Sequence, residues 1–287
     1  MTPLVQAALL GLAAAVGLAS LTWLASLVRR DVSLVDRVWS FVIAAPVVAY
    51  AWVLTPADDL RFEVMVVLLV LWAVRLAAYV TWRNWGHGED RRYQAIRARN
   101  GPNFPLTSLV YIFVLQAVLA WLVSMPFLAA LARPAPWTAI DASGAAIAAF
   151  GFVFEAVGDQ QLASFKAAPA HRGKVMDRGV WRYSRHPNYF GECCVWWGLW
   201  LMTLPGGGWW WSVVSPLVMT GLLLKVSGVA LLEKDIGERR PEYRDYIRRT
   251  NAFFPARRRR PRRVEPGGER ARQPPSTFFR HEQESAS

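Results

Sequence analysis

A polar segment, RYSRHPNYFGE at residues 182–192, lies directly before the apolar run CCVWWGLWLMTL. Its arginine, histidine, tyrosine, asparagine and glutamate side chains can bind anions, exchange hydrogen bonds and transfer protons. Asn188 and Glu192 are four residues apart, so a helix that begins here places both on one face. This chemistry at the start of an apolar helix predicts a binding or catalytic site at a membrane boundary.

The apolar runs around this segment indicate a membrane protein. The chain of 287 residues is 54% hydrophobic, and most runs approach the roughly 20 residues that a helix needs to cross a bilayer. We therefore predict an all-α integral membrane protein with about seven transmembrane helices, or roughly six to eight because two of the runs are short. The runs are residues 4–28, 38–54, 62–82, 106–132, 142–158, 191–204 and 209–232.

Basic residues are concentrated in alternate connections between these runs. The 33 Lys and Arg residues lie mainly after the first, third, fifth and seventh runs. By the positive-inside rule, we predict that the N-terminus is outside the cell and that the C-terminus is cytoplasmic. The net charge of +12 then reflects topology and attraction to anionic lipid headgroups, so we expect no nucleic-acid partner.

The chain divides into two predicted regions. Residues 1–256 are expected to form the multi-span membrane domain. Residues 257–287 are rich in arginine and proline and have no apolar period, which predicts a basic, disordered cytoplasmic tail. The adjacent cysteines, Cys193 and Cys194, cannot join distant segments, and no His and Cys spacing indicates a metal site.

Ionisable side chains inside the apolar runs extend the polar segment into a larger predicted site. Such groups are costly in lipid and normally face a protein-lined cavity. The cations in and beside the runs suit phosphate or a nucleotide-like anion, although simple charge neutralisation or snorkelling of long cations is the alternative. Residues expected at similar depth near the cytoplasmic ends are Arg75, Glu155, Asp159, Asn188, Glu192 and Lys225.

Several motifs carry a resemblance to known membrane enzymes. YSRHPNYFGE and LLEKDIGERRPEYRDYIRRTNAFFP resemble the C-terminal region of the steroid 5α-reductase superfamily. With SLVDRVWS and RNWGHGEDRRY, roughly residues 30–256 resemble more closely its bacterial branch known as DUF1295. The RHPxYxG core is shared with isoprenylcysteine and phospholipid methyltransferases. Asn188 followed by Gly191 and Glu192, however, is similar to the N-x-x-G-E of the reductases.

This resemblance implies an NADPH-dependent reductase of an activated C=C bond, such as an enone, on a steroid-like or other lipid substrate. The carbonyl oxygen then needs a hydrogen-bond donor as hydride reaches the β-carbon. The steroid enzymes' substrate-binding Glu and Tyr align with Asp36 and Trp72, and a tryptophan cannot act as a phenolic acid. The expected catalytic residues are Glu192, Asp36 and Tyr189. The expected cofactor-binding residues are Asn188, Glu192, Asp159, Lys166, Arg185, His186, Lys225, Arg75 and Tyr183.

Two other functions remain open from the sequence. An S-adenosylmethionine-dependent membrane methyltransferase is the alternative enzyme, and a transporter or scaffold is the non-enzymatic one. A 2′-phosphate on NADPH needs several cations, whereas S-adenosylmethionine needs none. The expected partners are a lipid-like substrate and membrane lipids, without an obligate protein partner. The expected location is the bacterial inner membrane, with the active site facing the cytoplasm.

Overall fold

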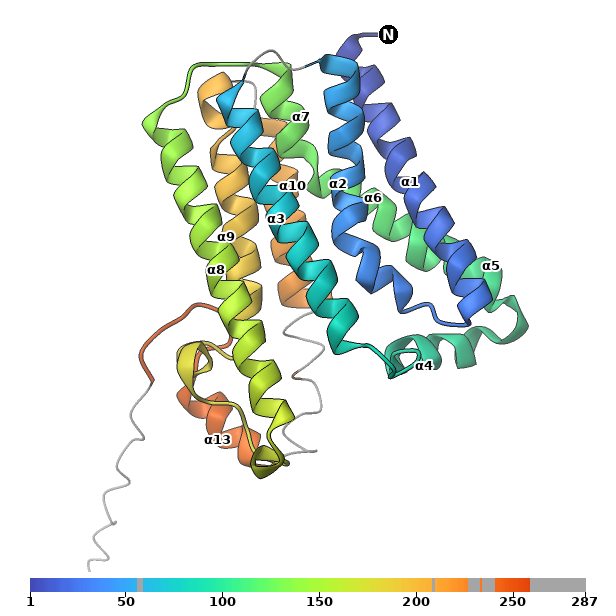
Figure 1. Cartoon of the computed structure of the whole chain (residues 1–287), viewed down its shortest axis with the longest axis vertical. Coiled ribbons are helices and arrows are strands. Elements are labelled where there is room, and N and C mark those ends of the chain that lie inside the picture. The colour runs from blue at the N-terminus through green and yellow to red at the C-terminus, as the bar shows by residue number, and fades with distance from the viewer. Residues whose placement is uncertain (56–58, 208–209, 227–232, 234–240, 259–287) are drawn as a thin grey trace, which may run out of the picture.

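The computed structural model describes residues 1–55, 59–207, 210–226, 233 and 241–258 (Figure 1). The named elements in these ranges are all helices, and the one β-type contact among them is an isolated bridge between Ser184 and Asn251. The all-helical class is therefore confirmed for the described residues.

Five helical stretches in these ranges are long and apolar enough to cross a membrane. Four are continuous: α1 (Pro3–Arg29), α2 (Leu34–Leu54), α3 (Leu60–Arg83) and α8 (Ala139–Ala167). The other, Arg91–Ala132, is segmented, and its bends separate the predicted run 106–132 into several pieces. Its parts are α4 (Arg91–Asn100), a 3-10 turn (Gly101–Asn103), α5 (Phe104–Ser108), a π-helical turn (Leu109–Val114), α6 (Leu115–Val123) and α7 (Met125–Ala132).

The last two predicted runs form shorter elements. α9 (Pro187–Leu201) has 15 residues, and it begins at Pro187 because proline is well suited to the first position of a helix. α10 (Val214–Gly221) lies in an apolar helical stretch, Trp210–Lys225, and α13 (Pro241–Arg249) follows later. Residues 227–232 of the seventh run and 259–287 of the predicted tail lie outside the described residues.

Glycines allow α8 and α9 to pack backbone against backbone. A Cβ on Gly151 would lie 2.5 Å from the carbonyl oxygen of Gly191, and one on Gly198 would lie 2.6 Å from that of Gly144. Small residues permit this close approach between helices in a membrane. The two helices are antiparallel, so Asp159, which follows Gly151 on α8, faces Asn188, which precedes Gly191 on α9.

A buried ion pair joins α3 to α8 at one end of the bundle. Arg61 donates from Nε to Asp141 at 2.5 Å and from Nη2 to the second Asp141 oxygen at 3.2 Å. Asp141 also accepts from Thr138 in a capping box that starts α8. The N-terminus lies at this same end, whereas α4 and α13 lie at the other (Figure 1).

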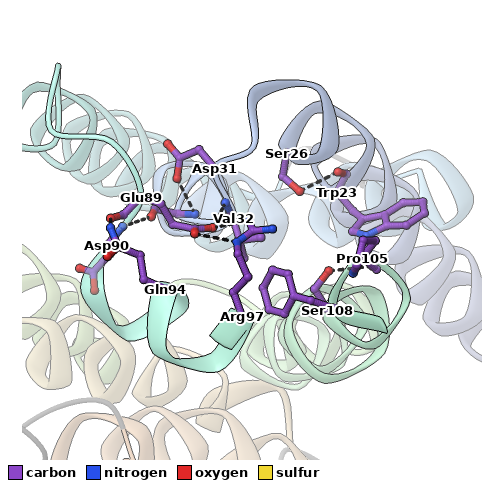
Figure 2. A network of polar contacts seen from close by, with 12 residues as sticks. Trp23, Ser26, Asp31, Val32, Glu89, Asp90, Gln94, Arg97, Pro105 and Ser108 are labelled. Carbon is purple, nitrogen blue, oxygen red and sulfur yellow. Dashed lines mark hydrogen bonds and ion pairs between the residues drawn. The ribbon is translucent and has the colours of Figure 1, made fainter. Parts of the chain in front are cut away.

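A polar network holds α4 against the connection between α1 and α2. Glu89 accepts from the Val32 amide at 2.9 Å and from both Arg97 Nη2 and Nε, at 2.7 and 3.0 Å (Figure 2). Partial burial would raise the pKa of Glu89, but the hydrogen bonds from Arg97 and Val32 outweigh it and lower that pKa. Arg97 also covers the Phe104 ring at 4.3 Å. α4 is thereby fixed across the ends of the long helices.

Candidate functional site

Arg75 joins two carboxylates of α8 inside the helix bundle. Its Nη1 lies 2.6 Å from Glu155 Oε1, and its Nη2 lies 2.6 Å from Asp159 Oδ2. Glu155 and Asp159 are one helical turn apart, which allows one guanidinium to reach both. They are only 2% and 4% exposed. The structure therefore brings together three of the residues that the sequence placed at similar depth.

Two further side chains complete the hydrogen bonds of these carboxylates. The Asn188 amide donates to Asp159 Oδ1 at 3.1 Å, and the Trp72 indole donates to Glu155 Oε2 at 3.2 Å. Asn188 comes from the first turn of α9, as the sequence predicted. Trp72 is therefore part of the polar group around Arg75.

Glu192 is the carboxyl group of this region that lacks a hydrogen-bond or ion-pair partner among the described residues. It is 8% exposed and interacts electrostatically with Asp159 and Arg75. One turn later, the fully buried Trp196 indole N–H also lacks a partner in the described part of the chain, and its ring packs edge-on against Trp72 at 5.2 Å. Neighbouring turns of α9 thus present an acceptor and a donor that no described residue satisfies.

Tyr189 follows Asn188 in the first turn of α9. Its ring stacks on His186 with the centroids 5.4 Å apart. The charges of Glu192, Arg83, Arg92 and Asp159 all act on its hydroxyl. The hydroxyl of Tyr189, a predicted catalytic residue, therefore interacts electrostatically with Glu192 and with Arg92 at the start of α4.

Asp36 belongs to a separate cluster that includes α4. Tyr93 donates to Asp36 Oδ1 at 2.8 Å, and Arg92 lies 3.0 Å from Oδ2. Asp36 makes no hydrogen bond to Glu192, so the two predicted carboxyls do not form one pair. Tyr93 was not selected from the sequence, although RNWGHGEDRRY contains it. Tyr93 is the phenol that lies beside Asp36 in the structure.

The RHP part of the motif is bound by the C-terminal segment. Arg185 donates to both oxygens of Glu233 at 2.7 and 2.8 Å, and His186 Nε2 lies 2.9 Å from Glu233. Burial would raise the pKa of Glu233, but the hydrogen bonds from His186 and Arg185 outweigh it and lower that pKa to about 2. Tyr183 is 43% exposed. None of these three predicted cofactor residues contacts the group around Arg75.

The two predicted lysines lie away from the carboxylate group. Lys166 is exposed in the last turn of α8, two turns after Asp159. Lys225 is exposed in a π-helical turn (Leu222–Val226) and makes no ion pair with a described residue. The prediction that Lys225 joins the buried site is therefore not supported by its position.

A cavity of about 300 Å³ lies between the α8–α9 connection and α13. Its lining combines aromatic side chains, among them Tyr246, with three cations and three carboxylates: Lys174, Arg178, Arg249, Asp177, Glu242 and Asp245. The His171 ring in its wall stacks on Phe165 at 4.2 Å, and His171 Nδ1 is buried without a hydrogen-bond partner in the described ranges. Aromatic rings and cations of this kind suit a nucleotide, whereas no His, Cys, Asp or Glu cluster among the described residues has a metal-binding arrangement.

The comparisons with known proteins support the motif resemblance. The chain is 26% identical over 262 residues to an uncharacterized protein of Schizosaccharomyces pombe, covering 81% of this chain and 75% of the relative. No solved structure gives a significant match. The family model described as "Protein of unknown function (DUF1295)" matches residues 22–250. Because that match extends over most of the chain, this protein belongs to the DUF1295 family.

Proposed function

We propose that this protein is a membrane-bound, NADPH-dependent reductase of an activated carbon–carbon double bond on a lipid-like substrate. The observation that carries the proposal is the pair of polar groups on neighbouring turns of α9: the Glu192 carboxyl, on a residue 8% exposed, which makes no hydrogen bond with a described residue, and the buried Trp196 indole N–H. A buried polar group without a partner, such as this indole N–H, is costly, so it favours a site completed by a ligand. The carboxamide of a nicotinamide offers the donors and the acceptor that Glu192 and Asn188 could bind.

The residues present fit the two ends of such a cofactor. Glu192 and Asn188 would hold the nicotinamide end, beside the buried Arg75 group. Lys174 and Arg178, in the wall of the cavity near α13, would hold phosphate groups. When bound, NADPH would supply the hydride that reduces the β-carbon of an enone.

The Asp36 and Tyr93 pair would serve the carbonyl end of the substrate. In this role, the Tyr93 hydroxyl would turn its single O–H from Asp36 to the oxygen on which negative charge develops. A proton must then reach the α-carbon, and Tyr93 or Tyr189 can provide it because both carry an ionisable hydroxyl. Arg92, 3.0 Å from Asp36, would offset negative charge in this cluster.

The proposed topology has seven spans, with α9 and the segment that begins at Trp210 as the last two. α4 and α13 lie at the same end of the bundle (Figure 1) and both carry several arginines. By the positive-inside rule, this end, with the Arg92 cluster and the cavity, would face the cytoplasm. The proposed location is a bacterial inner membrane. A hydrophobic substrate would arrive through the bilayer, while NADPH would arrive from the cytoplasm.

The test is turnover of enone-bearing lipids by the purified protein in detergent, followed as NADPH oxidation and as the saturated product. Tyr93→Phe should lower kcat on the order of 100-fold, the lower part of the range for a lost proton donor. Tyr111→Phe is the matched control, because Tyr111 is 72% exposed. Methyl transfer from S-adenosylmethionine without NADPH oxidation would replace the reductase by the methyltransferase alternative.

A further inference from the structure

The residues directly before α9 are bound from the C-terminal side of the chain. Arg185 is 8% exposed, and its guanidinium uses both sides of its fork on Glu233. Its Nη1 donates to the backbone carbonyls of Ile247 and Thr250, at 3.0 and 2.6 Å. These four contacts occupy most of the five N–H groups of an arginine. Little of this guanidinium is left to bind a phosphate.

Backbone contacts strengthen the same junction. The Arg185 amide donates to the Asn251 carbonyl at 2.9 Å, and the Ser184 hydroxyl donates to the Phe253 carbonyl at 2.8 Å. Tyr246 of α13 donates to the Trp181 carbonyl at 2.5 Å. The Trp181 indole in turn donates to the Gly158 carbonyl of α8 at 2.9 Å. The segment before α9 is therefore tied both to α13 and to the helix that carries Asp159.

This junction sets the position of the first turn of α9. His186 precedes Pro187, the first residue of the helix, and its ring contacts both Glu233 and Tyr189. Asn188 and Glu192 follow within the next turns. A displacement of His186 would therefore carry the Asn188 amide away from Asp159.

We infer that Arg185, His186 and Glu233 are positioning residues that fix the start of α9, and that Arg185 does not bind the cofactor itself. The catalytic consequence rests on the proposed function, because it concerns the Asn188 and Glu192 side chains of the proposed nicotinamide site. The structural part does not depend on which ligand occupies that site.

Amide hydrogen exchange measured by mass spectrometry tests the structural part without turnover. Glu233→Gln and Arg185→Gln should each speed exchange in residues 184–192 by roughly tenfold or more, because charge-assisted hydrogen bonds are lost. The double variant should add little to either single variant, since both remove the same interaction. Exchange in α1 and α2 should not change. Glu63→Gln, an exposed glutamate at the opposite end of the bundle, is the matched control.

Kinetics of the same variants test the catalytic part. Arg185→Lys keeps the positive charge but loses the fork, and it should behave like Glu233→Gln, with lowered kcat and an unchanged preference for NADPH over NADH. A phosphate-binding Arg185 gives the opposite pattern, in which Arg185→Lys weakens NADPH selectively and Glu233→Gln does not. That pattern, unchanged exchange at 184–192, or faster exchange throughout the chain would overturn the inference. Absence of reductase turnover in the wild type, with the exchange result intact, would reject the proposed function alone.

Discussion

Replacing Arg75 by glutamine should strongly destabilise the helix bundle. Arg75 is the cation between Glu155 and Asp159, each 2.6 Å away, and the two carboxylates have side chains only 3% and 6% exposed. Removing one partner of a buried pair costs about 3–5 kcal/mol, because a charge remains without compensation. Since Arg75 itself is 17% exposed, we take the lower end, about 3 kcal/mol. For a chain of this size, that corresponds to a melting temperature lower by about 6–12 °C.

The assay is thermal unfolding in detergent, followed by tryptophan fluorescence. The double variant Arg75→Gln/Glu155→Gln should recover part of the lost stability, because it also removes one of the two carboxylates that Arg75→Gln leaves without an ion-pair partner. Arg29→Gln is the matched control, since Arg29 is exposed at the end of α1. An unchanged melting temperature in Arg75→Gln, or a further loss in the double variant, would refute the reasoning.

Three other changes test the packing and charges that hold the site in place. Asp141→Asn should lower the free energy of unfolding by about 3–5 kcal/mol, because the buried Arg61 loses its ion-pair partner. A melting temperature below that of the wild type checks this. Gly191→Ala should cost about 1–3 kcal/mol, because its Cβ would lie 2.6 Å from the Gly151 carbonyl oxygen, and denaturation at equal detergent concentration measures the loss. Glu233, whose pKa is lowered to about 2, should stabilise the fold fully above its usual pKa of about 4.5 and lose this effect as pH falls toward 2. The stability difference between the wild type and Glu233→Gln should therefore shrink over that pH interval, and a constant difference would contradict the assignment.

The convergence of Arg75, Glu155, Asp159 and Asn188 could be predicted from the sequence because each lies near the same end of an apolar run. Ionisable groups at equal depth in a membrane are driven toward one another by the cost of burying each alone. The glycines of α8 and α9 also allow these two helices to touch, although the sequence alone did not reveal that contact. The depth of these residues along their helices was therefore predictable, whereas the rotation of each helix about its own axis was not.

The partners of Arg185 and Asp36 could not be predicted from the sequence. Arg185 and Glu233 are 48 positions apart, and Asp36 and Tyr93 are 57 apart. The second pair depends on how α4 packs across the end of the bundle, and the first on the position of Glu233, which precedes α13 in the chain. The motif predicts Arg185 as a cofactor ligand, whereas in the structure its guanidinium binds Glu233. The length of the apolar run also gave too short an estimate of α8. The helix continues beyond the predicted run 142–158 to residue 167, and its last turns are polar, so they do not add to the apolar run.

Ligand-induced stabilisation tests the central claim most directly. The wild type and Glu192→Gln would be melted in detergent with increasing NADPH, NADH or S-adenosylmethionine. Without ligand, Glu192→Gln should melt like the wild type, because the lost carboxyl has no hydrogen-bond partner among the described residues. We predict that NADPH stabilises the wild type, by about 2.7 kcal/mol at a hundredfold excess over Kd, that NADH does so less, and that Glu192→Gln responds weakly. Stabilisation by S-adenosylmethionine alone, or an equal NADPH response in Glu192→Gln, would contradict the account.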